Sequence, residues 1–264
     1  YAVSDERPEA AATATRWAAK VCPLPPPQPL SKKRRKSDAE KNADLLYYEN
    51  ILYNGALRGH PLVPTVPFGR GFGDDDGGGG SAERIRFVVM QRMGPNLQEA
   101  FEAAGGLFSP REVASLGLGM LTALRVLHEA HRMVFVDVKP QNFVLPAAGD
   151  RIGASARPAG PLEILSGVPV TKVYLLDFGL SECFVSAGGT AHRPFKQHAS
   201  PAGTPEFLSL SCHGGGSAGR SDDLEAVGYV LWHFLAGGRL PWSAARSDKD
   251  GRSLKQAATA PPAA

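Results

Sequence analysis

Two carboxylates, a carboxamide and a lysine in this sequence are the residue types that phosphoryl transfer requires. Asp137, Lys139 and Asn142 fall on one short segment, and Asp177 follows in Asp177-Phe178-Gly179. Asp137 can orient a hydroxyl group and accept its proton, and Lys139 can neutralise charge that builds up on a transferred phosphoryl group. Asn142 and Asp177 offer the hard oxygen ligands that Mg²⁺ prefers. These residues predict a Mg²⁺-assisted transfer of a phosphoryl group.

Flanking segments predict the elements that hold these residues. Ser109-Pro110-Arg111-Glu112 combines an N-cap serine, a proline at the first helical position and a glutamate at the third, which is a capping box. Apolar residues then recur at helical spacing to about His128, so a helix is expected there. Phe143–Leu145 and Lys172–Leu176 predict two short strands. The catalytic segment would precede the first strand, and Asp177-Phe178-Gly179 would follow the second.

Two further segments predict regular elements. Arg84–Met90 is rich in β-branched and apolar residues and ends at a polar turn, which indicates a strand. Asp223–Leu235 is apolar nearly all round, which indicates a helix buried in the centre of a domain.

The order of these motifs resembles that of the protein kinases. Phe135–Asn142 is similar to the catalytic loop His-Arg-Asp-x-Lys-Pro-x-Asn, and Asp177-Phe178-Gly179 is similar to the metal-binding motif. Ala18–Val21 resembles the third-strand motif Val-Ala-Ile-Lys. Tyr48–Tyr53 resembles the helix that carries the partner glutamate, and Met90–Pro95 stands where the hinge between the lobes is expected.

Within the kinases, the chain is most similar to the casein kinase 1 and vaccinia-related kinase group. Val63–Gly69, Met93–Leu97, Gly203–Gly215 and Arg220–Trp242 carry this likeness. Ser209-Leu210-Ser211 stands where the group has a Ser-Ile-Asn-like segment and most kinases have Ala-Pro-Glu. The resemblance implies an ATP-dependent serine/threonine protein kinase that uses Mg²⁺ and acts on a protein with a serine or threonine acceptor.

The resemblance also implies roles for individual residues in the chemical step. Asp137 would be the catalytic base, and Lys139 would contact the phosphoryl group. The Thr204 hydroxyl would lie near both. Asn142 and Asp177 would be the metal ligands that hold Mg²⁺ with ATP.

Other matching residues would bind ATP or support the site. Lys20 would contact the α- and β-phosphates and form an ion pair with Glu49, although Glu40, which lies in a polar run, is a rival partner. Asp223 would anchor the backbone of the catalytic loop. The hinge residues expected at the nucleotide, mainly through backbone groups, are Met90, Gln91 and Met93.

The implied fold is α+β, with a small β-rich lobe over residues 1–93 and a mainly helical lobe over residues 94–242. No glycine-rich loop precedes Lys20, and no counterpart of the last helices of a kinase large lobe follows Trp242. The chain also begins at Tyr1 and not at Met. Truncation at both ends is therefore expected.

Three segments, at about 23–43, 71–82 and 146–167, have compositions that cannot bury enough apolar surface, so surface insertions are expected. Residues 243–264 are expected to form a disordered tail. The basic run Lys32–Lys36 fits a nuclear import signal, a phosphate-binding patch or a solvated loop.

The catalytic loop departs from the kinase pattern at two positions. Phe135 and Val136 replace the usual histidine and arginine. An aromatic Phe135 can keep the packing of the loop intact. Val136 cannot make the charge-assisted hydrogen bonds that the arginine makes to a phosphorylated activation segment. The hypothesis is that activity does not depend on phosphorylation of that segment.

Composition limits the environment and the partners. The net charge of +3 over 264 residues gives no reason to expect nucleic-acid binding. Three widely separated cysteines indicate a reducing, intracellular compartment, nuclear or cytoplasmic. No apolar run is long enough for a membrane span. A monomer is also expected.

Besides an active kinase, two other functions stay open: a pseudokinase scaffold and a small-molecule kinase. Phe135 and Val136 favour the scaffold.

Overall fold

The structure is a computed structural model. It describes residues 2–3, 17–24, 36–64, 66, 85–147, 171–186, 189, 191–198 and 200–260. The chain divides into two compact units. The first unit comprises Tyr1–Met93 together with Asp177–Gly179, and the second comprises Gly94–Leu176 and Leu180–Ala264.

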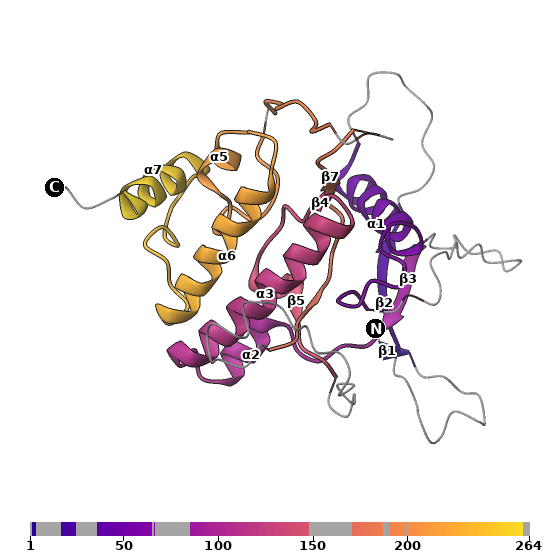
Figure 1. Cartoon of the computed structure of the whole chain (residues 1–264), viewed down its shortest axis with the longest axis horizontal. Coiled ribbons are helices and arrows are strands. Elements are labelled where there is room, and N and C mark those ends of the chain that lie inside the picture. Colours follow the sequence, from indigo (N-terminus) through magenta and orange to yellow (C-terminus); the bar gives the residue numbers. More distant parts are fainter. Residues whose placement is uncertain are drawn as a thin grey trace, which may run out of the picture. The chain divides into compact units, whose positions relative to one another are not determined.

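The first unit combines an antiparallel sheet with one long helix. Strands β1 (Ala2–Val3), β2 (Trp17–Pro23) and β3 (Ile85–Gln91) pair in the order β1-β2-β3. β3 is rich in residues that favour strands, and each residue of β2 pairs with it in antiparallel register. Helix α1 (Asp38–Asn54) begins with a capping box and contacts both β2 and β3 (Figure 1).

The second unit is mainly helical, with two short antiparallel ladders. Its helices are α2 (Leu97–Ala103), α3 (Pro110–Ala130), the short 3₁₀ element η2 (Pro140–Asn142), α5 (Leu210–His213), α6 (Arg220–Leu235) and α7 (Asp248–Thr259). Its ladders pair β4 (Met133–Val134) with β7 (Glu182–Cys183) and β5 (Phe143–Val144) with β6 (Tyr174–Leu175).

Helices α3 and α6 pack together at the centre of this unit (Figure 1). Buried apolar side chains on both helices, such as Met120, Leu124 and Phe234, form its core. Gly119 of α3 lies against the backbone carbonyl of Thr171, where a Cβ atom would collide. The glycine therefore lets the segment that enters β6 approach α3.

Several sequence predictions hold. The α+β class is confirmed, and so is the capped helix at 109–128, which is α3 with its box between Ser109 and Glu112. The strands expected at 84–90, 143–145 and 172–176 correspond to β3, β5 and β6.

Four predictions are wrong in part. Residues 38–43 do not belong to an insertion but form the first turns of α1, because Ser37 and Glu40 cap this helix. Residues 243–264 are not wholly disordered, and a helix does follow Trp242, because Ser247 caps α7. Helix α6 is not buried all round, since Leu224 and Leu235 on it are exposed. Asp177–Gly179 groups with the first unit and not with residues 94–242.

The remaining proposed insertion segments, 71–82 and most of 146–167, lie outside the described residues, as does most of the basic run 32–36. No helix in the described part of the chain combines the length and apolar character that crossing a bilayer requires.

Candidate active site

Lys20 lies at the centre of a charged cluster in the first unit. Its Nζ atom donates a hydrogen bond to Glu49 Oε2 at 2.7 Å and lies 3.0 Å from Asp177 Oδ1. Burial alone would lower the pKa of Lys20, but the carboxylates of Glu49 and Asp177 outweigh it and raise that pKa. Lys20 is therefore a firmly charged ammonium group. Glu40, the rival partner, instead accepts a hydrogen bond from the backbone amide of Ser37 at 2.7 Å.

The buried side chain of Glu49 also reaches the Asp-Phe-Gly segment. Its Oε1 atom accepts hydrogen bonds from the backbone amide of Phe178 at 3.2 Å and from the Tyr53 hydroxyl at 3.0 Å. The Tyr53 and Phe178 rings meet edge to face with centroids 5.6 Å apart. Glu49 therefore fixes Lys20 with one oxygen and the residue after Asp177 with the other.

Sequence reasoning did not identify Tyr53 as part of this cluster. The signal was present, because Tyr53 lies four residues after Glu49 on a helix, and such pairs meet on the helix surface. Burial and the Glu49 carboxylate raise the pKa of Tyr53 well above its ordinary value, so the phenol stays protonated and donates to Glu49.

Asp137 is the centre of a second cluster, which lies in the second unit. Its Oδ2 atom accepts a hydrogen bond from Lys139 Nζ at 2.6 Å, and its Oδ1 atom accepts one from the Thr204 hydroxyl at 2.8 Å. The Asn142 amide nitrogen donates to the Asp137 carbonyl at 2.9 Å and lies 3.2 Å from Oδ2. The structure thus brings three predicted residues, Lys139, Asn142 and Thr204, around the buried carboxylate of a fourth, Asp137.

The backbone before Asp137 is anchored by Asp223 of α6. The amides of Phe135 and Val136 donate to Asp223 Oδ2 and Oδ1 at 2.7 and 2.9 Å. The His128 Nε2 atom lies 2.8 Å from Asp223 Oδ2. The structure places Asp223 where the resemblance implied, while His128 is an addition that sequence reasoning missed.

Phe135 and Val136 are accommodated in different ways. The Phe135 side chain is fully buried and meets the Phe143 ring edge to face with centroids 5.9 Å apart. Val136 has a φ of 72°, a left-handed conformation that is unusual for a β-branched residue. The Asp223 carboxylate therefore holds a strained residue directly before Asp137.

Glycines allow close backbone approaches near the site. Gly203 has a φ of 108°, and a Cβ atom there would lie 2.9 Å from a methyl carbon of Leu208. In the second unit, the Gly94 amide donates to the Leu145 carbonyl at 2.9 Å. The three predicted hinge residues lie in the first unit. Met90 and Gln91 are the last residues of β3, and Met93 ends the segment Tyr1–Met93 of that unit.

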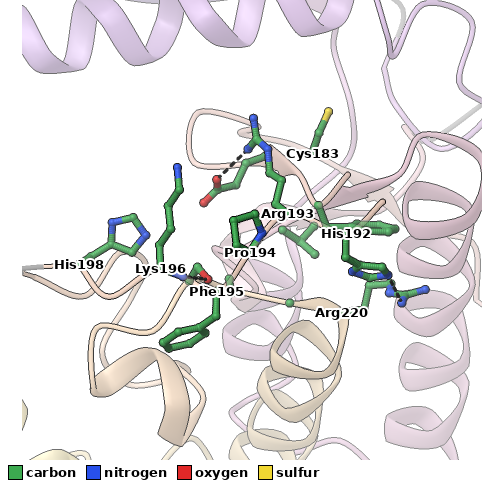
Figure 2. A pocket seen from close by; sticks show the side chains of 14 residues that line it. Cys183, His192, Arg193, Pro194, Phe195, Lys196, His198 and Arg220 are labelled. Atoms are coloured by element: carbon green, nitrogen blue, oxygen red, sulfur yellow. Dashed lines mark hydrogen bonds and ion pairs between the residues drawn. The ribbon is translucent and has the colours of Figure 1, made fainter. Parts of the chain in front are cut away.

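A positively charged pocket of about 250 Å³ lies elsewhere in the second unit. Figure 2 shows Arg193, Lys196, His198 and Arg220 among the side chains that line it. Among the described residues of this lining, Glu182 is the only acidic one, and it lies 3.4 Å from Arg193 Nη1. Arg220 is also engaged, with its guanidinium carbon 4.6 Å from the Phe184 ring centroid. The pocket suits a ligand that carries negative charge.

No cluster of three or more histidine, cysteine or acidic side chains in the described ranges could hold a metal ion by itself. The two predicted ligands, Asn142 and Asp177, belong to different units. Each of them offers a side-chain oxygen of a type that Mg²⁺ takes alongside phosphate oxygens.

Curated proteins similar to this chain are casein kinase I homologues. Casein kinase I homolog 3 of Schizosaccharomyces pombe is 30% identical over 217 residues, which cover 81% of this chain and 42% of the relative. Casein kinase I homolog 2 of Saccharomyces cerevisiae is 31% identical over 64% of this chain and 28% of the relative. A probable casein kinase I homolog of Encephalitozoon cuniculi is 34% identical over 60% of this chain and 44% of the relative.

The chain therefore spans less than half the length of these curated relatives. No protein family model matches the sequence.

Proposed function

The chain is a casein kinase I-like protein kinase, and from this premise we propose that it transfers the γ-phosphoryl group of ATP to serine and threonine hydroxyl groups of proteins. The observation that carries this proposal is the bond between Lys20 and Glu49 at 2.7 Å. A phosphotransferase requires a charged lysine at the phosphates, held in place by a carboxylate, and the Lys20–Glu49 pair has this form.

The first unit would bind the nucleotide phosphates. The Lys20 ammonium would hold the α- and β-phosphates. Glu49 fixes its position, and the nearby Asp177 carboxylate helps to keep it protonated. The backbone groups of Met90, Gln91 and Met93 would bind the rest of the nucleotide.

The second unit would act on the acceptor hydroxyl. The Asp137 carboxylate would accept a hydrogen bond from the serine or threonine hydroxyl, orient it and take up its proton as the phosphoryl group is transferred. Lys139, now 2.6 Å from Asp137, would turn its positive charge to the phosphoryl oxygens. Thr204 keeps the carboxylate in one orientation through its hydrogen bond at 2.8 Å.

Asn142 and Asp177 would hold Mg²⁺, which supplies positive charge at the β- and γ-phosphates. The Asn142 side chain is already oriented, because its amide nitrogen donates to the Asp137 carbonyl. The Asp177 side chain is about half exposed, with a relative accessibility of 46%, and is open to such a ligand.

The pocket of Arg193, Lys196, His198 and Arg220 supports a protein substrate with acidic residues. Its lining includes three arginine and lysine side chains and one glutamate, so negatively charged side chains would be attracted to it. That the protein is intracellular, monomeric and without a nucleic-acid partner stays a prediction.

The alternative is a kinase-like scaffold with little turnover, which the Phe135-Val136 substitution favours. Incubation of the protein with Mg²⁺ and labelled ATP on casein separates the two functions. If the protein is a kinase, the wild type should incorporate labelled phosphate into casein and Asp177→Asn should not. Equal background incorporation by both proteins would support the scaffold.

A further inference from the structure

Lys255 of α7 is a lysine whose side chain is fully buried, and none of the roles above uses it. Its Nζ atom donates to the Leu208 carbonyl at 2.6 Å, to the Pro205 carbonyl at 3.2 Å and to His213 Nε2 at 3.0 Å. An ammonium group has three N–H donors, so each proton has one acceptor. The geometry therefore matches the charged form of the side chain.

The His213 ring is arranged to accept this bond. Its Nδ1 atom lies 2.8 Å from Asp248 Oδ1, so an Nδ1 proton can donate to the carboxylate and leave Nε2 as an acceptor. Burial lowers the pKa of His213, and the positive charge of Lys255 lowers it further. A neutral ring with its proton on Nδ1 satisfies both neighbours.

Aromatic rings complete the surroundings of the ammonium group. Lys255 Nζ lies 4.6 Å from the Tyr229 ring centroid and 5.0 Å from that of Trp242, which are distances typical of cation–π contacts. The carboxylate of Asp248 is paired with His213 and not with Lys255. A charge buried in this way is costly unless hydrogen bonds compensate it, and the backbone groups that Lys255 holds provide them.

Those groups are the backbone carbonyls directly after Thr204. Lys255 binds the carbonyls of Pro205 and Leu208, and Trp242 Nε1 binds the intervening carbonyl of Glu206 at 2.8 Å. Side chains from the C-terminal part of the chain therefore hold three carbonyl groups within four residues.

The same segment leads directly to the catalytic carboxylate. The amides of Phe207 and Leu208 donate to the Thr204 carbonyl at 3.0 and 3.1 Å, which fixes this residue against the segment. The Thr204 hydroxyl in turn donates to Asp137 Oδ1 at 2.8 Å. An unbroken series of contacts thus runs from Lys255 through Leu208 and Thr204 to Asp137.

We propose that Lys255 is a positioning residue for phosphoryl transfer, which holds Pro205–Leu208 so that the Thr204 hydroxyl stays on the Asp137 carboxylate. This role rests on the proposed kinase function. The hydrogen bonds of Lys255 go to Pro205, Leu208 and His213, and none of these residues is expected to hold the nucleotide. Lys255 would therefore act on the chemical step and not on nucleotide binding.

The first test compares Lys255→Met with Lys249→Met, in which an exposed lysine of the same helix is changed. Steady-state kinetics on casein should show kcat reduced by about tenfold to a hundredfold in Lys255→Met, because small misplacements of catalytic groups have such effects. The KM for ATP should stay within about twofold of the wild type. Lys249→Met should match the wild type. A folded Lys255→Met protein with unchanged kcat would overturn the proposal.

Hydrogen exchange supplies a readout that does not need activity. The Phe207 and Leu208 amides should exchange faster in Lys255→Met than in the wild type and in Lys249→Met, and equal protection would overturn the proposal. If the wild type transfers no phosphate, the kinase function fails, while exchange still shows whether Lys255 holds the segment.

A pH profile covers the case in which Lys255→Met does not fold. Burial lowers the pKa of Lys255 to about 8, although Glu225, Asp248 and Glu206 oppose this. The other titratable groups that face it are His213 and Tyr229. Wild-type kcat should therefore fall above about pH 8, when one donor is lost. In Lys255→Arg, which stays charged, that fall should move to higher pH; coincident profiles would overturn the proposal.

Discussion

The Asp223 carboxylate accepts a hydrogen bond from the backbone amide of Val136 at 2.9 Å, while Val136 itself adopts a φ of 72°. The left-handed conformation is unfavourable for residues with a Cβ atom, and more so for β-branched ones. The loop before Asp137 is therefore held in place against its own local preference.

Val136→Gly should relieve this strain. Glycine adopts a positive φ freely, but it also has more conformational entropy in the unfolded chain, which offsets part of the gain. The free energy of unfolding should therefore rise by about 0.5–1 kcal/mol, as measured by denaturant unfolding. Val138→Gly is the matched control, since Val138 is buried without a positive φ and should lose stability. Destabilisation by both changes would contradict the assignment of strain to Val136.

Asp223→Asn should weaken the anchor of the catalytic loop. The carboxylate accepts from the amides of Phe135 and Val136 and contacts His128, whereas an asparagine has only one acceptor oxygen. A loss of about 2–3 kcal/mol in the free energy of unfolding is expected, because a buried donor loses its charged partner. Asp250→Asn, at an exposed position of α7, is the control and should unfold like the wild type. Equal stability of the two variants would show that the anchor is not needed.

His233 should make the fold sensitive to acid. Its ring is buried beside Phe101, Phe207 and Phe234, and within the described residues neither ring nitrogen has a hydrogen-bond partner. Burial lowers its pKa below 6.5, although Glu206 opposes this. The unfolded chain then binds the proton first, so stability is lost as the pH falls from 6.5 towards the lower folded pKa.

The variant His233→Phe should reduce that loss. Phenylalanine suits the aromatic surroundings and does not titrate, so melting temperatures measured at and below pH 6.5 should fall less steeply than in the wild type. His198→Gln, in which an exposed histidine is changed, should keep the wild-type slope. An unchanged slope in His233→Phe would mean that another group causes the acid sensitivity.

Activity should not depend on phosphorylation of the activation segment. Val136 has no group that could bind a phosphate, and its amide is already held by Asp223. Treatment of the purified protein with a phosphatase should therefore leave kcat on casein unchanged. A large loss of activity, restored by rephosphorylation, would contradict this prediction.

Lys196→Glu should weaken the binding of acidic peptides. The change reverses a charge in the pocket of Arg193, Lys196, His198 and Arg220, so the KM for a peptide rich in aspartate should rise while the KM for ATP stays constant. Lys249→Glu serves as the control for a change in net charge. An equal effect of both variants would mean that the pocket does not bind the substrate.

Helices and strands whose formation depends on neighbouring residues could be predicted from the sequence. The capping box at Ser109 and the apolar spacing behind it identified α3, and the β-branched run at 84–90 identified β3. The box between Ser37 and Glu40 is just as clear in the sequence, yet the polar composition after it led to the prediction of an insertion.

Other features could not be read from the sequence, because they depend on contacts between distant residues. His128 meets Asp223 across 95 positions, and Lys255 reaches Leu208 across 47. Helix α7 has no apolar stripe to reveal it, since its buried residues are Gly251 and Lys255. Only the folded structure shows that a lysine there is part of the core.

The most direct test of the kinase function is the initial rate of casein phosphorylation by the wild type and by Asp137→Asn, with Mg²⁺ and ATP in excess. Asparagine keeps the size of the side chain and still bonds to Thr204, but it cannot take up a proton. The wild-type rate should fall by about a hundredfold or more in the variant, as expected for the loss of a catalytic base. Equal rates in the two proteins would contradict it.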